Sequence, residues 1–204
     1  MRFALATALV VALCAPAQAT DRFPPIPPEK MTPEQKAVAD AIMTTRGSMN
    51  GPFYAWLRDP ALADRLEKTG EQVRFHTSLP HALNEFAILI TARHWTSQFE
   101  WYAHYPLALK AGLEASVADD LAGGIRPRGM SEDEAVVYDF STALHQSGTV
   151  SDDLYARAVA KFGEQGVIDL IAVNGYYDLV SMTLGVARFG LPDGVAPPLK
   201  PLSP

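Results

Sequence analysis

The segment from Asn84 to His104 is dense in side chains that can move protons or hold a ligand. Glu100 and His104 are four residues apart, so on one helix they lie on the same face, and Ser97 falls on that face one turn earlier. A carboxylate beside an imidazole orients the ring, fixes its tautomer and raises its basicity. The spacing therefore predicts an acid–base pair, with His104 as general base or acid and Glu100 as its partner.

Further residues near this pair are candidates for the same site. Glu85 precedes it by about one helix, and in a helical hairpin Glu85 would point toward His104 and support it. Arg93 is the nearest cation for a substrate carboxylate. Ser97, Trp101 and Tyr177 are candidates for substrate binding.

Other interpretations of these residues remain open. A Glu/His pair four residues apart is also common on solvated helix surfaces, where it contributes only a few tenths of a kcal/mol. Trp101 also suits a hydrophobic core, and Tyr177 also suits packing against a neighbouring element. The histidines show no His-x-x-x-His or His-Glu-x-x-His spacing, so we expect neither a metal site nor a cofactor.

The elements that must position these residues read as helices. Capping boxes at Thr32–Gln35 and Ser131–Glu134 predict two helix starts, and Asp59-Pro60 predicts another. No segment alternates between polar and apolar residues as a strand does. The sequence therefore predicts an all-α fold, with helical hairpins around one core. Its helices are expected near residues 33–45, from 60 through at least 73, and near 80–95, 97–111, 115–121, 132–145, 152–162 and 165–186.

The first nineteen residues have the pattern of a cleavable signal peptide. An arginine at position 2 precedes an apolar run that ends in Ala17-Gln18-Ala19, a small-x-small cleavage site. Cys14 is the only cysteine of the chain, so cleavage would leave a protein without a thiol. We expect a periplasmic or secreted bacterial protein.

Composition narrows the remaining possibilities. The net charge is -6 and no basic run is present, which disfavours nucleic acid as a partner. We divide the chain into a signal peptide (1–19), a Pro-rich arm (20–31), a helical domain (32–190) and a Pro-rich tail (191–204). Arm and tail are expected to lie over the surface or across a second subunit. No apolar stretch after the signal peptide is expected to cross a membrane.

The chemistry-bearing segment resembles the carboxymuconolactone decarboxylase family, which includes alkylhydroperoxidase D. The resemblance spans most of the chain after residue 51 and rests on Glu85, Ser97, Glu100, Trp101, His104, Ala108, Gly112 and Leu113. It implies an alkylhydroperoxidase D-like helical bundle, normally a homo-oligomer, over residues 32–190.

The peroxidase branch of that family has a Glu, eleven residues, Cys-x-x-Cys, three residues and a His. Glu85 and His104 match its ends, but Ser97 and Glu100 stand at the two cysteine positions. Because that peroxidase chemistry needs a reactive thiolate and a resolving thiol, the residues disfavour it here. The decarboxylase branch needs no thiol or cofactor. The resemblance then implies a lyase or isomerase for a small carboxylate or lactone, and a non-catalytic small-molecule-binding or scaffold protein is the alternative.

Overall fold

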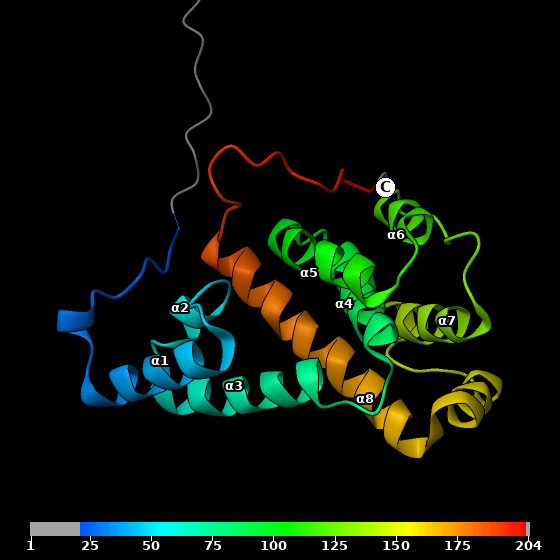
Figure 1. Ribbon diagram of the computed structural model, residues 1–204, viewed down its shortest axis with the longest axis horizontal. Coiled ribbons are helices and arrows are strands. Elements are labelled where there is room, and N and C mark those ends of the chain that lie inside the picture. The colour runs from blue at the N-terminus through cyan, green and yellow to red at the C-terminus, as the bar shows by residue number, and fades with distance from the viewer. Residues whose placement is uncertain (1–20, 203–204) are drawn as a thin grey trace, which may run out of the picture.

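A computed structural model describes residues 21–202 of the chain, and every helix bound below refers to that range (Figure 1). Eight α-helices and one short 3-10 helix, with no strand, make up the secondary structure there. The all-α prediction is thus confirmed for the described residues. The elements are η1 (Pro28–Lys30), α1 (Pro33–Arg46), α2 (Phe53–Trp56), α3 (Pro60–Phe75), α4 (His81–Trp95), α5 (Gln98–Ala111), α6 (Ala115–Ala122), α7 (Glu132–Ser147) and α8 (Asp152–Ala187).

Local signals account for most helix ends. The two predicted capping boxes form, with the Thr32 and Ser131 side chains accepting from the backbone N–H groups of Gln35 and Glu134. Each hydroxyl satisfies an N–H that has no partner within its helix. The short helices η1 and α2 were not predicted, because four residues or fewer carry too little periodicity to be recognised.

Helix α4 is the centre of the fold. Every residue from Leu83 to Arg93 is buried, and α4 contacts α5, α6, α7 and α8. A helix with apolar residues all round is typical of a buried core helix. Polar groups on α4, such as Glu85, are therefore held in the interior by neighbours on several sides.

Helices α4 and α5 form the hairpin that the sequence predicted. Thr96 ends α4 in the left-handed conformation, at φ 51°, and the Ser97 N–H donates to the Ala92 carbonyl at 2.8 Å. This C-terminal cap turns the chain sharply. Helix α5 then runs back along α4, which brings its buried face, with Glu100 and His104, against α4.

Helix α8 crosses the middle of the molecule, with α1 and α3 to one side of it and α4 and α7 to the other (Figure 1). The chain has non-helical torsions at Gly163, where the sequence predicted the break between two helices. Among the described helices, α8 alone has the length and composition of a membrane span, contrary to the expectation that none would. Half of its apolar window is buried inside the protein, and a core helix has the same character, so this is weak evidence for a span.

The arm and the tail both lie on the surface of their own chain. In the arm, the Arg22 N–H donates to the Ala187 carbonyl at the end of α8, 2.8 Å away. In the tail, Leu199 is buried and exchanges two hydrogen bonds with the Gln98 side chain. The tail runs from α8 to α6 across one end of the bundle (Figure 1). The predicted signal peptide lies outside the described residues.

Candidate active site

The hairpin places Glu85 and His104 in direct contact. Oε2 of Glu85 lies 2.7 Å from Nδ1 of His104, and the two side chains are only 1% and 5% exposed. A carboxylate at this distance accepts the Nδ1 proton and holds the ring in one orientation. With Nδ1 engaged by Glu85, Nε2 of His104 is the ring nitrogen that can accept or donate a proton.

Glu100 lies on the other side of the same imidazole. Its Oε2 is 3.5 Å from Nε2 of His104, and its side chain is also buried. Burial raises the pKa of Glu100, while the nearby His104 opposes this effect to a smaller extent. The three residues predicted as catalytic therefore meet in one buried row, with His104 between two carboxyl groups.

A cavity of about 540 Å³ that opens to solvent lies against this row. Glu100, His104 and Tyr177 are in its wall, and aromatic rings supply much of the remainder. The Tyr177 ring meets the His104 ring edge-on, with 5.1 Å between centroids. Burial raises the pKa of Tyr177, which favours the neutral phenol, a hydrogen-bond donor, beside the imidazole.

Two arginines that the sequence analysis did not select line the same cavity. Arg46 and Arg74 stand in the last turns of α1 and α3, and both are wall residues. Arg46 Nε pairs with Glu67 Oε2 at 2.6 Å. No local pattern links these arginines to the Glu/His segment, because α1 and α3 meet the α4–α5 hairpin through the packing around α8.

The other predicted substrate-binding residues lie outside the set that lines this cavity. The Arg93 guanidinium donates to the carbonyl of Lys200 in the tail at 3.0 Å. Ser97 is the N-cap of α5, and Trp101 is buried against Tyr105. Of the four predicted substrate-binding residues, the structure thus places only Tyr177 at the cavity. Arg93, Ser97 and Trp101 instead hold the tail, the start of α5 and the core.

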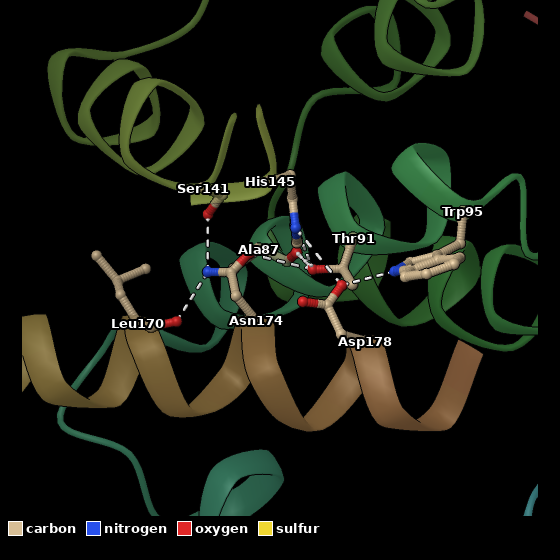
Figure 2. A network of polar contacts seen from close by, with 8 residues as sticks. All are labelled: Ala87, Thr91, Trp95, Ser141, His145, Leu170, Asn174 and Asp178. Carbon is tan, nitrogen blue, oxygen red and sulfur yellow. Dashed lines mark hydrogen bonds and ion pairs between the residues drawn. The ribbon is translucent and has the colours of Figure 1, made fainter. Parts of the chain in front are cut away.

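A second polar network crosses the core between α4, α7 and α8 (Figure 2). Asp178 accepts from the Trp95 indole at 2.6 Å and lies 3.5 Å from Nδ1 of His145. One turn earlier on α8, Asn174 accepts a hydrogen bond from the Thr91 hydroxyl at 3.1 Å and donates one to the Ser141 hydroxyl at 3.0 Å. The bonds of Asn174 satisfy the buried Thr91, Ser141 and Asn174 side chains, while Trp95 and Asp178 lie at the solvent-facing end, so we assign this network to structure.

No group of three or more His, Cys, Asp or Glu side chains within residues 21–202 has the geometry to hold a metal ion. The comparison with known proteins adds no assignment: no model of a known protein family matches the chain, and no curated protein sequence matches it. The interpretation of the site therefore depends on its geometry.

Proposed function

We propose that this protein is a cofactor-free lyase or isomerase that acts on a small carboxylate or lactone. The observation that supports this best is the position of His104, held between two buried carboxyl groups at the wall of a cavity. General acid–base catalysis needs a proton-transfer group that is oriented by a partner and close to bound substrate. Glu85 supplies the orientation, and the cavity supplies the room for substrate.

Each catalytic group has a separate task in this proposal. In an isomerisation, Nε2 of His104 removes a proton from a carbon next to a carbonyl group, and the Glu100 carboxyl returns a proton at the new position. In a decarboxylation, the bond to the departing carboxylate breaks and its electron pair passes into the adjacent unsaturated system. Carbon dioxide leaves, and the carbon then takes a proton from Glu100. Tyr177 donates a hydrogen bond to the developing enolate oxygen.

The proposal extends to the family. The order of Glu85, Glu100 and His104 on two consecutive helices supports a cysteine-less member of the carboxymuconolactone decarboxylase family with an alkylhydroperoxidase D-like bundle. Thiol peroxidase activity stays disfavoured, since residues 20–204 contain no cysteine. Export to the periplasm or outside the cell remains part of the proposal.

A homo-oligomer is also proposed, through the outer face of α8. Four exposed apolar side chains project from this face: Ile168, Ile171, Met182 and Val186. At 3.6 residues per turn they lie within about 60° of the helix circumference, and Gly175 between them has open space beside it. A second copy of the same stripe would cover these side chains. Sedimentation of an Ile168→Lys variant tests this, since a lower mass than that of the wild type is expected.

The test of catalysis is proton exchange, which requires no knowledge of the product. Purified protein is incubated in D₂O with a panel of small lactones and unsaturated carboxylates, and NMR follows the exchange of carbon-bound protons and the release of carbon dioxide. His104→Ala and Glu100→Gln are expected to lower the rate by about 10²-fold or more. Glu114→Gln, at an exposed position, is the matched control and should keep wild-type turnover.

The outcomes separate the two functional classes. Turnover that survives both site substitutions would show that these residues are not the catalysts. Binding without exchange or product for every compound that binds would instead favour the non-catalytic small-molecule-binding alternative.

A further inference from the structure

We propose that Arg46 and Arg74 form an anion-binding subsite in the cavity, which holds a carboxylate group of the ligand beside the Glu85–His104–Glu100 row. The identity of this ligand as a substrate rests on the proposed function, whereas its binding does not. These two arginines are distinct from Arg93, which does not line this cavity and donates from Nη2 to the carbonyl of Lys200 in the tail.

The buried Arg46 side chain has a hydrogen-bond donor that no described residue uses. Its side chain is 8% exposed, and Nε is paired with Glu67. Nη2 is buried and has no hydrogen-bond partner among the described residues. An unsatisfied buried donor is unfavourable, and more so when it is charged, so a ligand oxygen that reaches Nη2 would be favoured.

Arg74 provides the second cation. Its Nε is also buried without a hydrogen-bond partner, and no ion pair joins it to a described residue. The Phe75 ring lies near both guanidinium groups, with its centroid 5.9 Å from Cζ of Arg46 and 5.1 Å from Cζ of Arg74. One aromatic ring therefore supports two guanidinium groups that line the same cavity.

The balance of charge around the subsite favours an anion. Arg46 is paired with Glu67 at 2.6 Å, whereas no carboxylate among residues 21–202 lies within ion-pair distance of Arg74. Glu100 is not within ion-pair distance of Arg74 among the described side chains, and burial raises its pKa, an effect that His104 and Arg74 oppose to a smaller extent. A carboxylate ligand would supply the missing negative charge, and guanidinium groups bind carboxylates through paired hydrogen bonds.

The rest of the wall defines the class of ligand. Phe53, Phe99, Phe189, Tyr176 and Tyr177 contribute aromatic surface around a space of about 540 Å³, which is large enough for a compact organic molecule. We infer an aromatic or unsaturated carboxylate, with its anionic group at the arginines and its ring among the aromatic side chains.

Calorimetric titration with benzoate and its neutral isostere benzamide tests the subsite. Benzoate is expected to bind at least about tenfold more tightly than benzamide, and Arg74→Gln to remove at least about tenfold of that affinity. Arg74→Lys should retain part of the affinity, since it keeps the charge and loses the paired hydrogen bonds. Arg65→Gln, an exposed arginine on the same helix, should bind benzoate as the wild type does.

A substitution at Arg46 needs a compensated design. Arg46→Gln alone leaves Glu67 buried without its partner, which is unfavourable for folding. The double variant Arg46→Gln/Glu67→Gln avoids this and should also bind benzoate at least about tenfold more weakly. The Nε–H signal of Arg74, assigned by its absence in Arg74→Gln, should shift when benzoate is added.

Several results would overturn the subsite. One is a wild type that fails to bind benzoate, and another is a wild type that binds benzoate and benzamide equally. Benzoate affinity that is unchanged in Arg74→Gln would also overturn it. The Glu100→Gln variant separates this test from the catalytic proposal, because it should lower turnover by about 10²-fold or more and keep benzoate binding. Arginine-dependent binding without any turnover would support the subsite and count against the proposed reaction.

Discussion

Nδ1 of His104 lies 2.7 Å from Oε2 of Glu85, a residue nineteen positions earlier and on the neighbouring helix. Glu85 is 0% exposed, and its other carboxylate oxygen has no hydrogen-bond partner among the described residues. Its strongest contact is therefore the imidazole. Such a contact selects the tautomer with the proton on Nδ1, so that Nε2 faces Glu100 as an acceptor.

This relationship predicts a tautomer that NMR can read. At mildly alkaline pH, the ¹⁵N spectrum of His104 should show a protonated Nδ1 and an unprotonated Nε2. In Glu85→Gln, the amide can donate to Nδ1, and the proton should move to Nε2. Glu114→Gln is the control, and a tautomer that is unchanged in Glu85→Gln would show that Glu85 does not set it.

A second prediction concerns stability at Glu100. Burial raises its pKa above the ordinary value of 4.5, so above that pH the unfolded chain has released a proton that the folded protein still holds. The free energy of unfolding then falls as pH rises from about 4.5 to the folded pKa, by at most ~1.4 kcal/mol per pH unit. Glu100→Gln removes this term and should be more stable than the wild type at neutral pH.

Urea unfolding of both proteins across pH measures that difference. The stability advantage of Glu100→Gln should grow with pH through this window and then remain constant. A variant less stable than the wild type at neutral pH would mean that Glu100 is ionised and held by His104. In that case it is not the proton donor.

The sequence predicted the candidate-site residues that are close together in the chain and missed those that come from distant helices. Glu100 and His104 follow from helical spacing, and Glu85 follows from the hairpin, since all three depend on contacts within two consecutive helices. Arg46 and Arg74 belong to α1 and α3, and the packing of α1 on α3 and of α3 on α8 leaves no sequence pattern. Arg93 is close to the site in sequence, but the cap of α4 and the tail hold its guanidinium elsewhere.

The break between the last two helices shows the same contrast. Gly163, with φ 67°, is a strong local signal because left-handed torsions favour glycine. No such local signal predicts the paths of the Pro-rich arm and tail. The tail is fixed by long-range bonds such as that between Gln98 and Leu199, which only the folded chain brings together.

Two glycines in helices predict opposite effects of the same substitution. A Cβ at Gly70 in α3 would lie 2.2 Å from the Tyr176 hydroxyl and 2.6 Å from Arg46 Nη2. A Cβ at Gly175 in α8 would meet no heavy atom within 4 Å. Gly70→Ala should lower the free energy of unfolding by about 1–3 kcal/mol because the site is overpacked. Gly175→Ala should raise it by up to about 1 kcal/mol through better helix propensity.

Thermal and urea unfolding of both variants check this pair, with each variant acting as the control for the other. Gly70→Ala should also weaken benzoate binding, because it displaces Arg46 and Tyr176. Equal effects on stability would contradict the close packing of α3 against these two cavity residues.

The final prediction concerns acid sensitivity at His145. Burial lowers its pKa below the ordinary 6.5; Asp178 opposes this effect, and the stacked His94 ring reinforces it. As pH falls below about 6.5, the unfolded chain therefore takes up a proton before the folded chain does, and the free energy of unfolding decreases. The expected slope is below the limit of ~1.4 kcal/mol per pH unit, since Asp178 and Asn174 both oppose the lowering of the His145 pKa.

His145→Gln should reduce this loss of stability on acidification, because the amide carries no titrating proton and can still bond Thr91. Melting temperatures of both proteins over the mildly acidic range measure the effect. His76→Gln, at a histidine whose side chain is 59% exposed, is the surface comparison. If His145→Gln loses as much stability as the wild type on acidification, another group is responsible, and the network of Figure 2 does not make the fold acid-sensitive.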